Sequence, residues 1–258
     1  MAPARLAAGL RARAPRWGFV LDHDGTLAPF RRDPALALPS VRARNAVARL
    51  LAAGHPVCIV SGRPLVFLRY AWPLAGLDLA GSHGAERAWE LPGVAGPAAA
   101  GRRAARKLER TVRRVLRRAP AGLFVEAKPF GVAVHVRPLP PPLRAVWLAA
   151  AEQALRAALP GGYRLLRGDC VVEARPRGAN KGRVVRRLRR GPVRWRGLPL
   201  CAAGDDRTDE DLFAALGSRD VGVLVARRAR PSAAGFRLSG VGELLTLLEA
   251  VGGGGKER

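Results

Sequence analysis

Short apolar runs alternate with longer amphipathic stretches along this 258-residue chain. Residues 19–22, 56–60 and 77–80 are apolar runs too short for helices, and they predict strands. Between the first two runs, apolar residues recur at roughly helical spacing over residues 39–53, and Gly54 follows in the position of a helix C-cap. The pattern therefore predicts an α/β protein whose parallel strands end at one shared crevice.

The same alternation returns in the last quarter of the chain. Apolar runs at residues 200–204 and 221–225 predict two more strands, and residues 241–251 predict a last helix. Residues 252–258 are glycines and charged residues, which predict a flexible tail. The strands from both ends of the sequence are thus expected to form one Rossmann-like parallel sheet.

The middle of the chain has a different pattern, which predicts a smaller α/β domain inserted into the first. Its order is helix, strand pair, helix, strand pair, over residues 102–118, 123–137, 143–159, 163–166 and 169–174. We therefore expect a core domain made of residues 1–98 and 176–251. A cap domain of residues 99–175 would interrupt it.

Acidic residues follow the first predicted strand directly. Asp22 and Asp24 stand at its end, ahead of Gly25, which permits a tight backbone turn. A carboxylate at such a strand end can attack phosphorus, and a second one two residues later can transfer protons. The alternative is an N-capped turn, in which both carboxylates only accept hydrogen bonds from backbone amides.

Two further segments would complete a phosphate site. Ser61 and Gly62 follow the second strand, where a hydroxyl group and neighbouring amides can bind a phosphate oxygen. Lys181 lies at an expected helix start, where free amides favour anions and an ammonium group can neutralise a phosphate.

A second group of carboxylates follows the strand over residues 200–204. Asp205, Asp206 and Asp209 at this strand end suit a hard, oxygen-seeking cation such as Mg²⁺. The competing explanation is the acidic N-terminus of a helix, capped by its own side chains.

Charged residues also share one face of the first hairpin predicted in the cap. Strand periodicity places Glu126 with Lys128, and His135 with Arg137. Pairing Glu126 opposite His135, across a four-residue turn over residues 129–132, would bring all four side chains together. Such a face suits a sugar, and an exposed sheet face with alternating charge has the same pattern.

Composition narrows the classes of function. The net charge is +25, carried almost entirely by arginine, and a basic surface attracts anions. Aromatic residues, which single-strand nucleic-acid binders use for stacking, make up only 5% of the chain. No apolar run reaches the ~20 residues of a membrane helix, and residues 1–16 lack the apolar segment of a signal peptide. We therefore expect a cytoplasmic protein without a nucleic-acid or membrane partner.

The order of these motifs resembles that of the haloacid-dehalogenase-like hydrolases, and the finer pattern resembles the trehalose-6-phosphate phosphatases among them. The resemblance is carried by Asp-His-Asp-Gly-Thr at 22–26, Gly-Ser-His-Gly-Ala-Glu at 81–86, Val-Glu-Ala-Lys at 125–128, His-Val-Arg at 135–137, Val-Glu-Ala-Arg-Pro at 172–176, Asn-Lys-Gly at 180–182 and Gly-Asp-Asp-Arg-Thr-Asp-Glu at 204–210. His23 departs from the family, in which this position is often aromatic.

The resemblance implies roles for the carboxylates. Asp22 would be the nucleophile that forms an aspartyl-phosphate, and Asp24 the general acid and base. Mg²⁺ would be bound by Asp22, by the backbone carbonyl of Asp24 and by Asp205. Asp206 and Asp209 would orient these ligands or their waters.

The resemblance also implies which residues hold the substrate. The phosphoryl group would be bound by Ser61, Gly62 and Lys181. The sugar would be bound by His83, Glu126, Lys128, His135, Arg137, Glu173 and Asn180.

The expected reaction is the Mg²⁺-dependent hydrolysis of trehalose 6-phosphate to trehalose and phosphate, a step of trehalose biosynthesis. The alternatives are a phosphatase of the same fold for sucrose 6-phosphate or a glycosyl-glycerate phosphate, and a regulatory relative that only binds. A separate trehalose-6-phosphate synthase, bound to this chain or free, would supply the substrate. We expect the chain itself to be a monomer.

Overall fold

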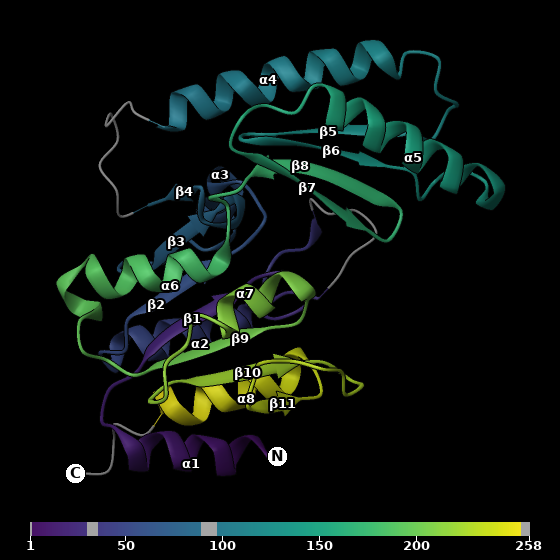
Figure 1. Ribbon diagram of the computed structural model, residues 1–258. Coiled ribbons are helices and arrows are strands. Elements are labelled where there is room, and N and C mark those ends of the chain that lie inside the picture. The colour runs from purple at the N-terminus through teal and green to yellow at the C-terminus, as the bar shows by residue number, and fades with distance from the viewer. Residues whose placement is uncertain (1, 30–35, 89–96, 254–258) are drawn as a thin grey trace. The chain divides into compact units, whose positions relative to one another are not determined.

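The computed structural model describes residues 2–29, 36–88 and 97–253. The chain divides into two compact units, each with its own sheet (Figure 1). Unit 1 joins Met1–Glu90 to Asn180–Arg258, and unit 2 is Leu91–Ala179. The predicted cap of residues 99–175 lies within unit 2. Among the helices of the described residues, none has the length and apolar composition needed to cross a membrane.

Over the described residues, unit 1 is built on a seven-stranded sheet with the order β11-β10-β9-β1-β2-β3-β4. Its neighbouring strands are parallel except for the β3–β4 pair. The strands are β1 (Gly18–Asp22), β2 (Val57–Val60), β3 (Asp78–Gly81), β4 (Glu86–Arg87), β9 (Leu200–Gly204), β10 (Val221–Val225) and β11 (Phe236–Leu238). This confirms the predicted α/β class with a mainly parallel sheet.

Helices cover both faces of this sheet (Figure 1). Because side chains alternate along a strand, Phe19 and Leu21 of β1 pack on one face and Val20 packs on the other. The first face is covered by α1 (Pro3–Arg13), α2 (Val41–Ala52) and α8 (Val241–Gly252). The second is covered by α6 (Lys181–Arg190) and α7 (Glu210–Phe213), whereas Leu68 and Ala71 of α3 (Leu65–Ala71) pack on the first face. The carboxyl ends of β1 and β9 are therefore held by buried residues on both sides.

Unit 2 has a four-stranded antiparallel sheet with the order β5-β6-β8-β7. The strands are β5 (Phe124–Lys128), β6 (Gly131–His135), β7 (Tyr163–Gly168) and β8 (Val171–Pro176). The helices α4 (Pro97–Val115) and α5 (Pro141–Ala157) pack on one face, where the strands and helices form a separate apolar core. The other face carries the charged residues of the hairpin.

The predicted register of the first hairpin in unit 2 is wrong by two residues. Phe124, not Glu126, stands opposite His135, and the turn has two residues instead of four. The reason is that Val132, which was placed in the turn, is fully buried in the core of unit 2 and continues the strand. Because the side-chain period of a strand is two, a shift of two leaves every side chain on its predicted face.

Candidate active site

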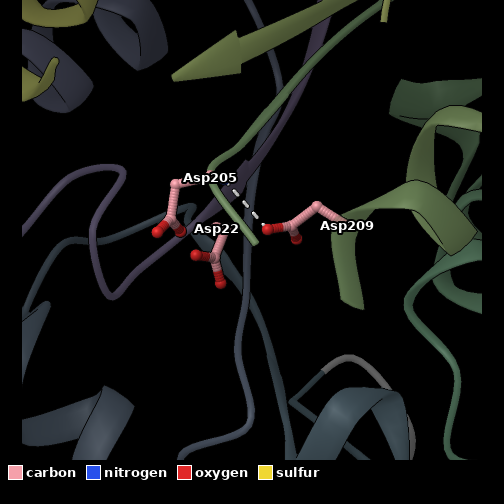
Figure 2. Close-up of side chains that lie close together, drawn as sticks. All are labelled: Asp22, Asp205 and Asp209. Atoms are coloured by element: carbon pink, nitrogen blue, oxygen red, sulfur yellow. Dashed lines mark hydrogen bonds between the residues drawn. The ribbon is translucent and has the colours of Figure 1, made fainter. Parts of the chain in front are cut away.

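Three carboxylates meet at the carboxyl ends of neighbouring strands in unit 1. Asp22 ends β1, Asp205 follows β9, and Asp209 ends the 3₁₀ helix η4 (Arg207–Asp209). One oxygen atom of each lies within 4.8 Å of the other two (Figure 2). Carboxylate oxygens at this spacing are the ligands that hard divalent cations prefer, so the residues present fit Mg²⁺. The sequence had suggested Asp209 only as a residue that orients ligands.

The loop after β9 places these side chains by close backbone packing. The β1–β9 register pairs Leu21 with Ala203, so both strands end at the same level of the sheet. A Cβ atom on Gly204 would lie 2.2 Å from the carboxyl carbon of Asp209, so only glycine permits this approach. Asp209 Oδ2 then accepts hydrogen bonds from the backbone amides of Asp205 and Asp206, both at 3.0 Å.

Capping therefore explains part of this acidic loop. The Asp206 carboxylate accepts a hydrogen bond from the Arg207 amide at 2.6 Å and forms a reciprocal capping box with Asp209. The second oxygen of Asp209 remains directed at Lys181, so this residue serves both the cap and the site. Of the two explanations offered by the sequence, capping is observed, and the magnesium site stays a prediction that the same loop allows.

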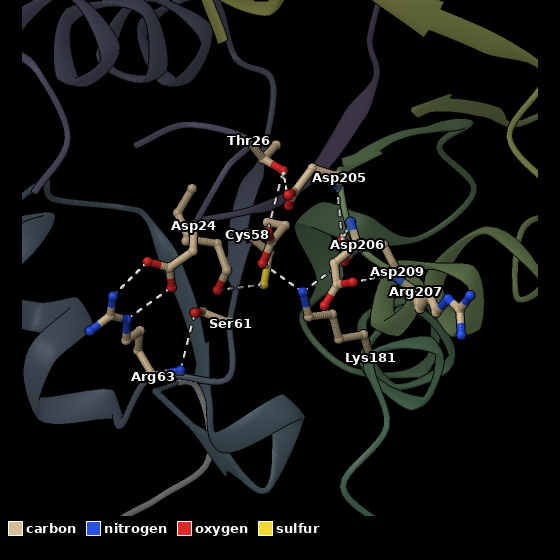
Figure 3. A network of polar contacts seen from close by, with 12 residues as sticks. Asp24, Thr26, Cys58, Ser61, Arg63, Lys181, Asp205, Asp206, Arg207 and Asp209 are labelled. Carbon is tan, nitrogen blue, oxygen red and sulfur yellow. Dashed lines mark hydrogen bonds and ion pairs between the residues drawn. The ribbon is translucent and has the colours of Figure 1, made fainter. Parts of the chain in front are cut away.

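Lys181 contacts two of the three carboxylates and offsets part of their negative charge (Figure 3). It is the first residue of α6, it is 3% exposed, and its Nζ lies 2.5 Å from Asp22 Oδ1 and 2.7 Å from Asp209 Oδ1. Burial would lower the pKa of Lys181, but the two carboxylates raise it above its usual value. The ammonium group is therefore charged in this site.

The carboxylates themselves are held at raised pKa values. Burial raises the pKa of Asp22, and the ion pair with Lys181 offsets this only in part. Burial and the neighbouring Asp209 raise the pKa of Asp205 to about 6. The Thr26 hydroxyl lies 3.3 Å from an oxygen of Asp22 and 3.3 Å from one of Asp205, so it can donate to either. Excess negative charge at this point favours a bound cation.

Asp24 is paired with Arg63, a residue that the sequence patterns did not single out. Arg63 makes a bidentate ion pair with it, with Nε at 2.9 Å from Oδ2 and Nη2 at 2.6 Å from Oδ1 (Figure 3). The Arg63 guanidinium also lies 4.8 Å from the ring centre of Phe67. The sequence position of Arg63 could have identified it. The residue follows Ser61 and Gly62 at the end of β2, which pairs with β1, the strand that ends at Asp22.

Ser61 and Gly62 form a tight loop with His83. Ser61 is buried, and its hydroxyl accepts a hydrogen bond from the Arg63 amide at 3.1 Å. A Cβ atom on Gly62 would lie 2.8 Å from His83 Nε2, so the imidazole packs directly on this glycine. His83 has a left-handed φ of 54° and donates its amide to the Ser61 carbonyl at 2.8 Å. The structure thus places His83 beside the predicted phosphate loop of unit 1.

His23 links the two aspartates to the surrounding core. Its Nδ1 accepts a hydrogen bond from the Trp72 indole at 3.1 Å, and its Nε2 lies 2.8 Å from the Ala37 carbonyl. An indole N–H only donates, so Nδ1 is unprotonated and Nε2 carries the proton. Burial lowers the pKa of His23, which agrees with this neutral tautomer. A phenylalanine at this position would lack both hydrogen bonds.

Four of the predicted sugar residues form one connected row on unit 2. His135 Nε2 lies 2.9 Å from Glu126 Oε2, and Lys128 Nζ lies 3.9 Å from Glu126 and 3.2 Å from Glu173. These contacts join β5, β6 and β8 on the face that the helices leave open.

Two other predicted sugar residues have different contacts. Arg137 lies beyond the end of β6 and pairs with Asp169 at 2.8 Å, with both side chains exposed. Asn180 caps α6, because its side-chain oxygen accepts a hydrogen bond from the Arg183 amide at 3.2 Å.

Unit 1 has the haloacid-dehalogenase-like fold: a mainly parallel sheet of this strand order, with carboxylates at the ends of β1 and β9 and a lysine at the start of α6. A solved structure of such a hydrolase from Bacteroides thetaiotaomicron superposes with a TM-score of 0.59 at 18% identity, covering 92% of this chain and 99% of that one. The C-terminal domain of Candida albicans trehalose-6-phosphate phosphatase superposes with a TM-score of 0.77 at 23% identity, covering 97% and 96%. These likenesses show the fold.

The sequence model of the trehalose-phosphatase family matches residues 20–241, and the chain belongs to this family. Trehalose-phosphate phosphatase of Mycobacterium marinum is 36% identical over 219 residues, which are 82% of this chain and 54% of the relative. Trehalose-phosphatase of Schizosaccharomyces pombe is 31% identical over 229 residues, 81% of this chain and 26% of the relative. A Mycobacterium tuberculosis protein described as an uncharacterized glycosyl hydrolase is 37% identical over 237 residues, which are 84% of this chain and 17% of the relative. The chain thus spans 17% to 54% of these three relatives, and the resemblance seen in its motifs is confirmed.

Proposed function

We propose that this chain hydrolyses trehalose 6-phosphate to trehalose and phosphate. The observation that carries the proposal is the buried cluster of Asp22, Asp205 and Asp209 around Lys181 in a member of the trehalose-phosphatase family. Transfer of a phosphoryl group to an aspartate requires a carboxylate nucleophile and positive charge near the phosphoryl oxygens. A bound cation and a lysine supply that charge.

Asp22 would attack the phosphorus atom and form an aspartyl-phosphate. Lys181 favours the ionised form of this buried carboxylate through the 2.5 Å contact, and the same ammonium group can then neutralise a phosphoryl oxygen. Asp22, the backbone carbonyl of Asp24 and Asp205 would hold Mg²⁺, with Asp209 beside them, and the ion would supply further positive charge to the phosphoryl oxygens when it is bound. Ser61 would bind a phosphoryl oxygen through its hydroxyl group.

Asp24 would protonate the departing sugar oxygen and then deprotonate the attacking water. In the structure both of its oxygens accept hydrogen bonds from Arg63, so this ion pair must open before Asp24 can donate a proton. A phosphate dianion competes for the guanidinium group and would open it. Substrate binding would thus free the Asp24 carboxylate to take up a proton from solvent, which it would then donate to the sugar oxygen in the first half of the reaction.

The sugar would be bound by the row of Glu126, Lys128, His135 and Glu173 on unit 2, which offers carboxylate acceptors and an ammonium donor. A bifunctional trehalose-6-phosphate synthase/phosphatase of Thermoproteus tenax is 31% identical over 247 residues, 92% of this chain and 32% of the relative. It supports the proposal that a synthase supplies the substrate. We place the reaction in the cytoplasm and assign it to a monomer.

The test is phosphate release from trehalose 6-phosphate, sucrose 6-phosphate, glucose 6-phosphate and a glycosyl-glycerate phosphate, each with Mg²⁺ or EDTA. We expect a Mg²⁺-dependent preference for trehalose 6-phosphate that Asp22→Asn abolishes. Glu109→Gln is the matched control, because it neutralises a carboxylate on α4 of unit 2. This variant should keep the preference for trehalose 6-phosphate. A preference for another sugar would overturn the substrate, and no turnover of any substrate would favour a protein that only binds.

A further inference from the structure

The open face of the unit 2 sheet carries an aromatic ring next to its charged row. Val125 of β5 packs into the core under α4 and α5, so strand alternation directs Phe124 and Glu126 to the opposite face. Phe124 is 57% exposed, whereas Phe19, Phe130 and Phe213 are at most 5% exposed. An exposed phenylalanine leaves a large apolar area in water, which folding alone does not favour.

Phe124 is held in place by a chain of contacts with that row. It stands directly opposite His135 in the hairpin, and the two ring centres are 5.9 Å apart at an interplanar angle of 32°. His135 contacts Glu126 at 2.9 Å, and Lys128 continues the chain to Glu173. The phenyl ring therefore lies beside groups that can bind hydroxyls.

A pyranose ring needs this combination of groups. Its rim carries hydroxyls, which carboxylates and ammonium groups bind, and its faces carry C–H groups, which an aromatic ring covers. The row of Glu126, Lys128 and Glu173 provides only the first kind of contact. Phe124 adds the second kind at one end of the row.

We propose that Phe124, which lies beside His135, packs against the C–H face of a sugar ring and determines specificity for a disaccharide phosphate. This inference rests on the proposed function of the chain. Phe124 would contribute to binding of the sugar and not to cleavage of the phosphate ester, because it lies apart from the carboxylate cluster in sequence and belongs to unit 2.

The experiment compares Phe124→Trp, Phe124→Leu and Phe124→Ala in the full chain, with trehalose 6-phosphate and with para-nitrophenyl phosphate, a substrate without a sugar. We expect Phe124→Trp to keep the KM for trehalose 6-phosphate. Phe124→Leu and Phe124→Ala should raise it about 3- to 10-fold with kcat nearly unchanged, since an aromatic contact is worth ~0.5–1.5 kcal/mol. The leucine variant separates stacking from simple apolar contact.

Val115→Ala is the matched control, because Val115 is 58% exposed on α4 of the same unit and should leave both KM values unchanged. Equal KM values for the wild type and Phe124→Leu would overturn the inference, as would equal losses with both substrates. Hydrolysis of para-nitrophenyl phosphate without any turnover of trehalose 6-phosphate in the wild type would instead overturn the proposed substrate, so the two failures are distinct.

Discussion

At the scale of single residues, the site is an excess of negative charge arranged around one buried ammonium group. Asp22, Asp205 and Asp209 supply three carboxylates, and Lys181 contacts two of them. Burial strengthens these interactions and makes each charge dependent on its partners. Removing a single charge should therefore have large effects on both stability and catalysis.

Lys181→Met tests this dependence. It leaves two buried carboxylates without their cation, so we expect a loss of about 3–5 kcal/mol in the free energy of unfolding in EDTA. We also expect kcat to fall about 10²- to 10³-fold with Mg²⁺ present, because a charge on the phosphoryl oxygens is lost. Chemical denaturation and phosphate release measure the two effects. Arg183→Met, an exposed change two residues along α6, should alter neither, and a fully stable Lys181→Met would refute the expectation.

The raised pKa of Asp205 predicts how metal binding depends on pH. Its pKa is about 6 in the folded, metal-free protein and close to 3.8 when unfolded. This group therefore favours the folded state below its unfolded pKa, and that contribution is lost as the pH rises toward about 6. Protons and Mg²⁺ compete for the same oxygens.

We expect Mg²⁺ to raise the melting temperature more at about pH 7.5 than at about pH 5. Melting curves with Mg²⁺ or EDTA at both values measure the difference. Asp205→Asn should remove most of the Mg²⁺ effect and much of its pH dependence. An equal Mg²⁺ effect at both pH values would show that the carboxylates do not bind the cation as described.

The sequence predicted most of these residues, because Asp22, Asp205 and Lys181 each stand at the start or end of a clearly patterned element. It did not predict that Arg63 binds Asp24, since two side chains 39 positions apart meet only through the pairing of β1 with β2. The contact of Gly62 with His83 could not be predicted either, because it also depends on which strands pair. Local patterns identify groups with reactive chemistry, and the sheet decides which of them meet.

At the scale of elements, apolar runs predicted the central strands closely, while elements with weaker patterns were missed. The strands β9 and β10 have their predicted bounds. The helices α1 and α3 and the two-residue strand β4 were not predicted. In α1, Leu6 and Leu10 give only a narrow apolar stripe, and α3 is too short to show a period. Such elements depend on tertiary packing.

The helix α4 is covered with like charges. Arg102, Arg106, Arg110 and Arg114 follow one another at intervals of four residues, and all are exposed. Like charges at this spacing destabilise a helix by roughly 0.2–0.5 kcal/mol per pair. The helix tolerates this row of four arginines because its buried side, with Leu108 and the residues that pack on it, holds α4 in place.

Arg110→Glu should therefore stabilise the protein. It converts two repulsive pairs into attractive ones, for a gain of about 1 kcal/mol at low ionic strength that disappears near ~1 M salt. Arg110→Gln, which only removes the charge, should give about half of this gain. Chemical denaturation at both salt concentrations measures it. A loss of stability at low salt would mean that Arg110 makes a favourable contact that outweighs its repulsion by Arg106 and Arg114.

At the scale of the whole molecule, the net charge of +25 acts on every anion that approaches. A long-range field raises the rate at which a charged substrate is captured, and dissolved salt screens it. It has no comparable effect on a substrate that is already bound. Charge should therefore influence the second-order rate constant of catalysis more than the turnover number.

We expect kcat/KM for trehalose 6-phosphate to fall several-fold between about 20 mM and about 500 mM NaCl, with kcat changing little. Steady-state kinetics at fixed Mg²⁺ concentration measure both quantities. The same series with sodium sulfate separates screening from competition, because sulfate also occupies phosphate sites. A salt-independent kcat/KM would show that local contacts, not the overall field, control capture.

The division of unit 1 into two segments has a consequence for the order of events during synthesis. The central strand β1 has β2 on one side and β9 on the other, and β9 lies about 180 positions later in the chain. As the protein leaves the ribosome, unit 2 emerges as one continuous segment with its core complete, whereas β1 waits with one edge exposed until β9 follows. Asp22, the proposed nucleophile, is thus made before unit 2, whereas Lys181, Asp205 and Asp209 are made after it. The sheet proposed to bind the sugar can therefore fold before the carboxylate cluster of unit 1 is complete.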